Sequence, residues 1–222
     1  MPSVYQLKTG FQNLLRPICK FLASVGVTAN QVTITAAILS VAMGITIFNF
    51  PFIRWIYFIL PAFLIFRMGL NAIDGMLARE HNMKSPLGAI LNELGDVVSD
   101  ATIYLAFVAV PILNPYAVVS IVILAIFSEF AGVVAVQIGA SRKYEGPMGK
   151  SDRAFWFGLL SLALAFNLNI SGWINYALWA ICGLTGLTIL NRCRAALKEL
   201  SVNNKSHNNS QESTVSTNDN QA

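Results

Sequence analysis

Two groups of residues, each with oxygen-bearing side chains at helical spacing, lie close together in an apolar part of this chain. In the first group, Asn71, Asp74 and Ala78 fall on one face of a predicted helix. The second group recurs at steps of four residues and consists of Gly88, Asn92, Asp96 and Asp100. Because only 12% of the residues are charged and 55% are hydrophobic, ionisable groups here indicate a functional site. Two facing helices with oxygen ligands can hold a hard cation, Mg or Mn.

The spacing of these residues resembles the signature of the CDP-alcohol phosphatidyltransferase family, D-x(2)-D-G-x(2)-A-R-x(8)-G-x(3)-D-x(3)-D. Every interval of that signature is kept. The residue types agree at Asp74, Gly75, Ala78, Arg79, Gly88 and Asp96. Asn71 and Asn92 stand where the family has aspartates. The segment 29–33, Ala-Asn-Gln-Val-Thr, is similar to the P-N-x-x-T sequence with which the family enters its first span.

The resemblance implies an enzyme that transfers a phosphatidyl group from CDP-diacylglycerol to a small alcohol and releases CMP, in phospholipid biosynthesis. It implies Asp96 as the general base that takes the proton of the alcohol. The implied ligands of one or two Mg or Mn ions are Asn71, Asp74, Asn92 and Asp96. The implied contacts to the CDP moiety are Asp74, Gly75, Ala78, Arg79 and Gly88. Family members are often homodimers, although no feature of this sequence demonstrates association.

The two asparagines reduce the negative charge of the implied metal site. An amide offers a carbonyl oxygen to a cation but contributes no charge. With two carboxylates in place of four, a site for two ions is weakened. We therefore expect one tightly held ion and a second that the substrate bridges.

The composition predicts an all-α integral membrane protein. The chain has 222 residues and a mean hydropathy of +0.58. Stretches near the roughly 20 residues that a helix needs to cross a bilayer lie at 31–50, 53–72, 86–112, 115–140, 154–170 and 172–191. The expected catalytic domain is therefore one six-helix unit spanning residues 29–200.

The distribution of Lys and Arg predicts the orientation of these spans. Basic residues precede the first span, follow the sixth, and occur between the second and third and between the fourth and fifth; Arg54 is the only one in the alternate loops. Both termini are thus expected in the cytoplasm of a bacterium, with the site at the cytoplasmic end of spans two and three in the inner membrane. The net charge of +4 is explained by these loops and their attraction to membrane lipid, so nucleic-acid binding is not implied.

The two ends of the chain differ from its centre. Residues 1–28 are expected to contain an amphipathic juxtamembrane helix with a bend at Pro17; packing of this helix on protein is the alternative. Asn30 is expected to cap the first span, and Ser85 the third. Residues 201–222 contain no aromatic, Leu or Ile side chain, so this cytoplasmic tail is expected to be disordered.

Other polar residues within the spans leave alternatives open. Arg67 lies one turn before Asn71 and is expected either to bind substrate phosphate or to snorkel to the interface. Glu129 is expected to make an interhelical hydrogen bond or to remain protonated rather than to act in catalysis. Glu93 lies about 100 degrees from the stripe of the second group and is expected to face elsewhere. Asp100 is expected to support the site from one turn deeper.

The segment 146–153 resembles the family's G-K segment before the fifth span. Lys150 and Arg153 are expected either to lie near the substrate headgroup or to serve only as determinants of topology. Two other functions compete with the enzyme. The asparagines favour a catalytically silent relative that binds CDP-lipid, and the buried acids alone favour a membrane transporter. The sequence does not name the acceptor alcohol.

Overall fold

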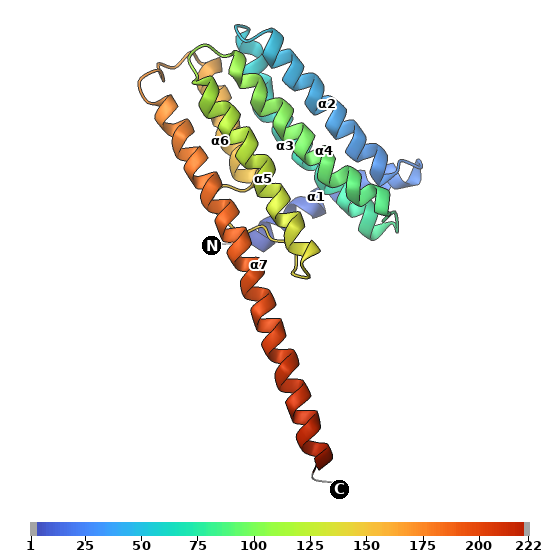
Figure 1. Ribbon diagram of the computed structural model, residues 1–222. Helices are drawn as coiled ribbons and strands as arrows, with labels where there is room; N and C mark the ends of the chain where they lie inside the picture. Colours follow the sequence, from blue (N-terminus) through green and yellow to red (C-terminus); the bar gives the residue numbers. More distant parts are fainter. Residues whose placement is uncertain (1–3, 220–222) are drawn as a thin grey trace.

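The computed structural model describes the backbone of residues 4–219 and the side chains of residues 10–202. Every regular element in this part of the chain is a helix, so the predicted all-α class is confirmed (Figure 1). The α-helices are α1 (Val4–Ser24), α2 (Ala29–Asn49), α3 (Arg54–Glu80), α4 (Pro86–Leu105), α5 (Pro115–Gln137), α6 (Lys150–Ala165) and α7 (Ile174–Asp219), with a 3-10 turn, η1 (Ala106–Ala109), after α4.

The starts of α2 and α4 follow from local capping chemistry. The Thr28 hydroxyl accepts a hydrogen bond from the Gln31 N–H, and the Gln31 side chain accepts one from the Thr28 N–H, a reciprocal capping box. The prediction that Asn30 caps this helix is therefore wrong, because Asn30 already lies in its first turn. Ser85 caps α4 as predicted, accepting from the Gly88 N–H at 2.9 Å.

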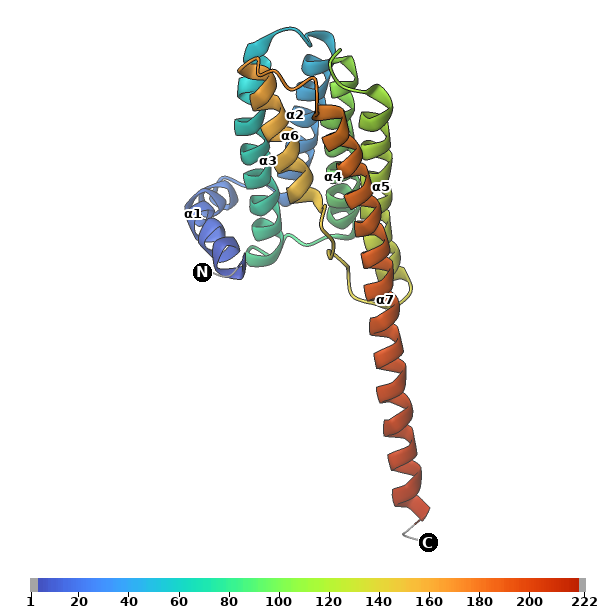
Figure 2. The same ribbon diagram turned by 90° about the vertical axis from the view of Figure 1, so that its left-hand side faces the viewer.

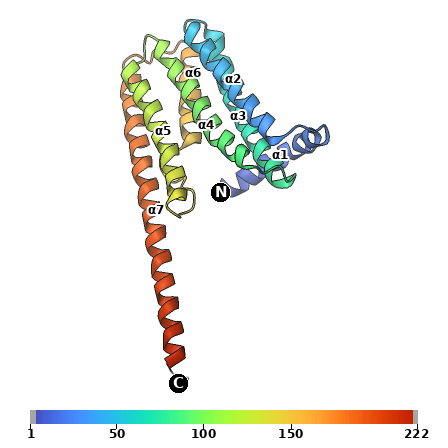
Figure 3. The same ribbon diagram turned by 45° about the vertical axis from the view of Figure 1, so that its right-hand side comes forward.

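Six of the seven helices form a bundle. α2 packs against α3 and α4, α4 against α5, α3 against α6, and α5 against α7. Figures 1 and 3 show α2 to α6 and the first half of α7 running roughly along one direction. Helices that are distant in sequence, such as α3 and α6, therefore lie side by side.

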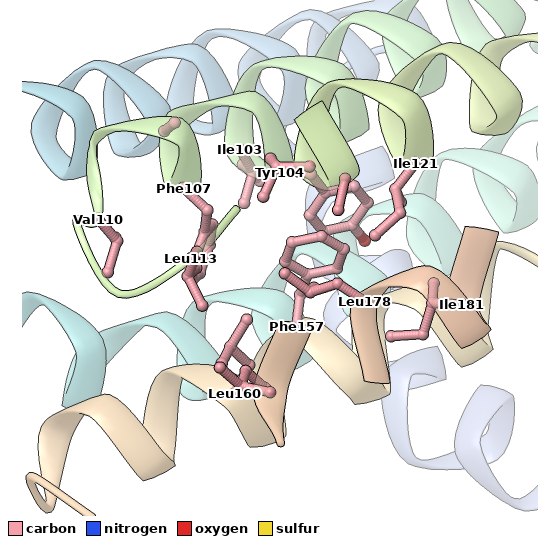
Figure 4. Packing of buried hydrophobic residues seen from close by; sticks show 14 of the residues in the cluster. Ile103, Tyr104, Phe107, Val110, Leu113, Ile121, Phe157, Leu160, Leu178 and Ile181 are labelled. Carbon is pink, nitrogen blue, oxygen red and sulfur yellow. The ribbon is translucent and has the colours of Figure 1, made fainter. Parts of the chain in front are cut away.

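A buried aromatic cluster fixes α4 relative to α6 (Figure 4). The Tyr104 ring of α4 stacks on the Phe157 ring of α6 with centroids 4.2 Å apart, and Phe107 of η1 meets Phe157 edge-on at 5.2 Å. Each such pair adds about 0.5–1.5 kcal/mol to the burial of its rings. The cluster therefore holds the start of α6 close to the polar face of α4, on which Asp96 lies.

Within the described residues, four helices are long and apolar enough to cross a membrane: α2, α3, α5 and the part of α7 from Ile174 to Val202. The predicted count of six spans is not confirmed by this measure. α6 has only 16 residues, and α4 carries Glu93, Asp96 and Asp100. The outer faces of the bundle expose large apolar side chains, among them Ile38, Ile65 and Phe130, as expected for contact with lipid.

α1 lies across one end of the bundle, beside α3 (Figure 2). Leu15 and Leu22 pack on one side of it with the buried Cys19, in a cluster that includes Met76 of α3. Its other side exposes Leu14, Ile18, Phe21 and Val25. One face thus packs on protein, the alternative expected from the sequence, while a second apolar face is free to enter a lipid interface. Pro17 lies inside the helix.

α7 extends well beyond the bundle (Figures 1 and 2). It continues to Asp219, past residue 201, from which the sequence predicts disorder. The side chains of 203–219 and all of 220–222 lie outside the described residues. The prediction of a disordered tail stays a prediction.

Candidate active site

Two of the predicted site residues, Asn92 and Asp96, border an open cavity of about 350 Å³. The beginning of α4, the loop between α5 and α6, and the start of α6 supply most of its wall, and α5 and α7 complete it. Its lining residues are Asn92, Glu93, Asp96, Glu129, Arg142, Tyr144, Gly149, Lys150, Ser151, Asp152 and Arg192. Of the implied metal ligands, Asn92 and Asp96 face this cavity.

Asp96 is surrounded by hydrogen-bond donors and positive charge. The Lys150 ammonium forms an ion pair with its Oδ1 atom, and the Asn71 side-chain amide donates to the same oxygen at 2.8 Å. Nη2 of Arg67 lies 3.8 Å from it. The side chain of Asp96 remains 27% exposed. A substrate in the cavity can therefore reach this carboxylate.

Asp74 lies deeper than Asp96 and has a neutral partner. It is buried, and its Oδ2 atom accepts a hydrogen bond of 2.7 Å from the Thr33 hydroxyl. Thr33 lies in α2, so three helices, α2, α3 and α4, contribute to the polar centre. Thr33 belongs to the segment 29–33 at the entry to the first span, and that segment is the signal in the sequence that could indicate this contact.

The four implied metal ligands are brought to one region, but they provide only two carboxylates. Asn71 donates to Asp96, and Asn92 lines the cavity beside it. Among residues 10–202, no group of three or more His, Cys, Asp or Glu side chains is placed to hold a metal ion. The oxygen donors of Asp74, Asp96 and the two amides suit one hard cation better than two.

Gly75, Ala78 and Arg79 lie on the last turns of α3. The Arg79 guanidinium lies over Gly75, where a Cβ atom would be 3.1 Å from its Nη1. Ala78 is half-buried against the cluster formed with α1, so its small size also serves packing. Arg79 is exposed and forms no ion pair with any residue in the described part of the chain. Its charge is therefore free for a phosphate group.

Gly88 has a packing role that the sequence did not reveal. A Cβ atom at this position would lie 2.7 Å from Oδ1 of Asn30 and 3.0 Å from Oγ of Ser85. These distances are shorter than normal contacts, so an added methyl group would require the side chains of Asn30 and Ser85 to shift. The implied contact of Gly88 with CDP stays a prediction, next to this structural reason for the glycine.

Of the two positions expected for Arg67, the structure contradicts snorkelling, and binding of a substrate phosphate stays a prediction. Its side chain is 5% exposed and does not snorkel to the interface. Nη2 lies 2.5 Å from Oδ1 of Asp100 and reaches toward Asp96. Asp100 is buried as well, and Nη2 of Arg153 lies 3.6 Å from its other oxygen. Asp100 thus supports the site one turn deeper, as expected.

Glu129 of α5 is the centre of a cluster of arginines from three other segments. Arg153 of α6 lies 3.0 Å from Glu129, Arg192 of α7 lies 3.4 Å from it, and Arg142 of the loop between α5 and α6 lies 3.5 Å from it. Arg192 also donates to the Ser128 carbonyl. We call Glu129, Arg142, Arg153 and Arg192 the Glu129 cluster. The interhelical contact expected of Glu129 is present, but it is made with charged partners.

Two further expectations about this wall require correction. Glu93 does not face elsewhere: it lines the cavity and lies 2.5 Å from Nη1 of Arg142, because the loop after α5 folds over that side of α4. Lys150 and Arg153 are not topology determinants alone. Lys150 pairs with Asp96, and Arg153 is fully buried between Asp100 and Glu129. Helical periodicity cannot predict such contacts between distant segments.

Comparison with known proteins agrees with this geometry. Residues 26–186 match the CDP-alcohol phosphatidyltransferase family. The inner membrane protein YnbA of Escherichia coli (strain K12) is 44% identical over 196 residues, which cover 88% of this chain and 96% of YnbA. An uncharacterized protein of Aquifex aeolicus (strain VF5) is 33% identical over 98 residues, 43% of this chain and 46% of that protein. The chain is thus similar along nearly its whole length to an inner membrane protein and, like it, is an integral membrane protein.

Solved structures share the fold. Phosphatidylinositol phosphate synthase (PgsA1) of Mycobacterium tuberculosis with CDP-DAG bound superposes with a TM-score of 0.65 at 20% identity, covering 81% of this chain and 92% of that one. The same enzyme in complex with manganese and citrate gives a TM-score of 0.67 at 20% identity, covering 82% and 88%. At 20% identity, these comparisons show a shared fold and do not assign an activity to this chain.

Proposed function

Since this chain belongs to the CDP-alcohol phosphatidyltransferase family, we propose that it transfers a phosphatidyl group from CDP-diacylglycerol to a small alcohol and releases CMP, as a step of phospholipid biosynthesis. The observation that carries this proposal is the position of Asp96. Its carboxylate lies on the wall of a cavity of about 350 Å³ that also presents Lys150 and Arg192. A base next to fixed positive charges is suited to an alcohol that attacks a phosphate.

In the proposed reaction, the alcohol oxygen attacks the phosphorus of the phosphatidyl group. A new P–O bond forms, and the P–O bond to CMP breaks, with its electron pair leaving on CMP. The Asp96 carboxylate takes the proton of the alcohol. Asn71 and Lys150 hold this carboxylate in place through its Oδ1 atom, so its Oδ2 atom is the one that faces the acceptor.

The CDP moiety is proposed to bind at the end of α3. Gly75 and Ala78 present little side-chain bulk there, so a nucleotide can approach the backbone. Arg79 is exposed and unpaired within the described residues, which suits it to the negative charge of the diphosphate. Asp74, held by Thr33, lies one turn before Ala78 and belongs to the same binding surface.

A divalent cation, Mg or Mn, is proposed to bind Asp74, with oxygens of Asn71, Asn92 and Asp96 as its other protein donors. When bound, such an ion neutralises the charge that builds up on the phosphate groups. The manganese in the structure of the mycobacterial enzyme supports this assignment.

The six-span arrangement is proposed for this function, with α4 and α6 also crossing the membrane. The segments between helices alternate between the two ends of the bundle (Figure 1): 81–85 and 138–149 lie at one end, and 50–53, 110–114 and 166–173 at the other. α4 and α6 turn their charged residues toward each other, so their apolar residues can face lipid. The cavity then opens at the end that is rich in Lys and Arg, proposed to be cytoplasmic.

A catalytically silent relative that binds CDP-lipid is the second candidate. The Asn71 amide and the Lys150 ammonium occupy Oδ1 of Asp96, which is the observation that favours it. The experiment that separates the two uses purified protein, labelled CDP-diacylglycerol, Mg or Mn, and a panel of small alcohols. The enzyme is expected to release CMP with at least one alcohol. A folded protein that is stabilised by CDP-diacylglycerol, but releases no CMP with any alcohol at any metal concentration, would identify the silent relative.

A further inference from the structure

The carboxylates of the site carry too little charge for two divalent cations. At the four positions that correspond to the family's aspartates, Asp74 and Asp96 are acids, whereas Asn71 and Asn92 are neutral. Two divalent cations would bring four positive charges to two carboxylates, whereas the two positive charges of a single ion equal the two negative charges of these carboxylates. In the described part of the chain, no third acidic, histidine or cysteine side chain joins them to form a metal cluster.

Asp96 already faces a cation supplied by the protein. The Lys150 ammonium pairs with Oδ1, the Asn71 amide donates to that same atom at 2.8 Å, and Nη2 of Arg67 lies 3.8 Å away. All three groups present hydrogen-bond donors or positive charge to Oδ1 of Asp96, and only the side-chain oxygen of Asn71 remains available to a cation. This side of Asp96 is therefore occupied by the protein's own charge.

Asp74 has the opposite environment. Its partner at 2.7 Å is the neutral Thr33 hydroxyl, and no ion pair joins it to any residue between 10 and 202. Because Asp74 is 95% buried, its negative charge is costly unless a cation balances it. Asp74 is thus the carboxylate that remains for an external ion.

We propose that the Lys150 ammonium takes the place of a second metal ion, so that the site holds one divalent cation, at Asp74. This inference rests on the proposed function, since it concerns how the charge of the transferring phosphate is balanced. The sequence left open whether Lys150 lies near the substrate headgroup or serves only topology; this inference assigns it the charge of a metal ion at the phosphate.

Lys150 is held in a position suited to this role. It is the first residue of α6, and Gly149 before it is fixed by a hydrogen bond of 2.9 Å from its N–H to Asp152. Met148 is buried, and its N–H donates to the Thr188 hydroxyl of α7 at 2.9 Å. The side chain therefore starts from a rigid backbone, so less entropy is lost when it fixes its charge than on a mobile loop.

A fixed ammonium can perform part of the work of a metal ion. It brings one positive charge and three hydrogen-bond donors to the oxygens of a phosphate. The Lys150 ammonium lies next to the Asp96 carboxylate, which receives the alcohol proton. The base and the positive charge therefore act on the same phosphate group. The asparagines and the lysine then form one adaptation. With two acids fewer, the site holds one metal ion fewer, and the ammonium of Lys150 supplies a positive charge in place of that ion.

The test is a Mn²⁺ titration of the purified full-length chain without substrate, in which electron paramagnetic resonance measures free Mn²⁺. Wild type is expected to bind one ion per chain. Lys150→Met frees Asp96 and removes a positive charge, so the bound ion should be held roughly tenfold tighter or more. Lys150→Gln, which keeps a polar side chain in case Met disturbs folding, should act in the same direction.

The full reversal combines Lys150→Met with Asn71→Asp and Asn92→Asp. Four carboxylates without the ammonium should bind two ions per chain. The matched control is Lys84→Met, because Lys84 is exposed in the segment before α4 and its loss changes net charge equally; its Mn²⁺ affinity should remain that of wild type.

The inference is overturned if wild type binds two ions, if it binds none, or if Lys150→Met and Lys150→Gln both bind Mn²⁺ as Lys84→Met does. These outcomes are independent of turnover. A wild-type protein that binds one ion, responds to Lys150 as expected and yet releases no CMP would contradict the proposed function while leaving the charge substitution intact.

Discussion

Asp96 has an environment that combines exposure with fixed charge. It borders the cavity, yet one of its oxygens contacts both Asn71 and Lys150. A general base must be ionised and must have one oxygen free for the acceptor. The contacts on Oδ1 orient the carboxylate, and they leave its other oxygen for the alcohol.

Replacement of Asp96 by Asn is therefore expected to reduce CMP release by about a hundredfold or more, the usual contribution of a positioned base, while CDP-diacylglycerol still binds. The measurement is single-turnover CMP release alongside thermal stabilisation by CDP-diacylglycerol. Glu145→Gln, an exposed change in the neighbouring loop, serves as control and should leave both unchanged. Near-normal turnover of Asp96→Asn would refute the assignment of the base and direct attention to Asp100.

At this scale the sequence predicted which residues share a helix face, but not how they pair. Helical spacing places Asn71 and Asp74 on one face of α3, and the structure adds the hydrogen bond from Asn71 to Asp96 of α4. The ion pair of Asp96 with Lys150 could not be predicted from helical spacing. Lys150 lies 54 positions further on, and the packing of α6 on α3 brings it to Asp96. Glu93 was placed wrongly for the same reason.

At the scale of elements, α2 and α4 approach so closely that a methyl group added at Gly88 would displace the side chains that face it. Gly88 faces Asn30 across this contact, and the packing of α2 on α3 places Thr33 next to Asp74. The contact between the two helices is therefore part of what positions the site. A signature glycine in this chain has a mechanical reason that is independent of any ligand.

Gly88→Ala is expected to lower the free energy of unfolding by about 1–3 kcal/mol, the usual cost of an added methyl group in a tight contact. Thermal unfolding in detergent without ligand measures it. Asn30→Ala should recover part of the loss, since it removes the oxygen 2.7 Å from the new Cβ. Gly183→Ala in α7, which meets nothing within 4 Å, is the matched control. If Gly88→Ala unfolded like wild type and weakened only CDP-diacylglycerol binding, the glycine would serve the nucleotide instead.

The existence and order of the helices could be predicted from apolar stretches, because each stretch had nearly the length of a helix. Their ends were harder to place. The capping box of Thr28 and Gln31 was overlooked in favour of Asn30, although both residues are good signals in a sequence. The two-sided packing of α1 also depends on α3, which lies far away in the sequence.

At the scale of the whole molecule, charge separates the two ends of the bundle. The end that includes 81–85 and 138–149 carries most of the Lys and Arg residues, and the cavity lies near it. The proposed acceptor would reach Asp96 through this cavity. If the proposed function is correct, the orientation of the chain decides which compartment supplies the alcohol.

Single cysteines in a cysteine-free background can measure this orientation. Glu145→Cys, in the exposed part of the loop before α6, is expected to resist a membrane-impermeant maleimide in intact cells and to react in inverted vesicles. Phe52→Cys, 79% exposed at the opposite end, should show the reverse, and a reporter fused after residue 200 should read cytoplasmic. Labelling of Glu145→Cys from outside the cell would overturn the six-span topology and the cytoplasmic cavity together.

The Glu129 cluster also has a consequence for biogenesis. Ribosomes synthesise the chain from its amino end, so Arg192 is the last member of the cluster to emerge, after Glu129, Arg142 and Arg153 are already in place. Insertion of α7 then covers the Ser128 carbonyl and completes the wall of the cavity in one event. A chain that ends before α7 leaves polar groups facing lipid, which is costly. A chain without α7 is therefore expected to be less stable than the full chain, and this difference in stability distinguishes the two.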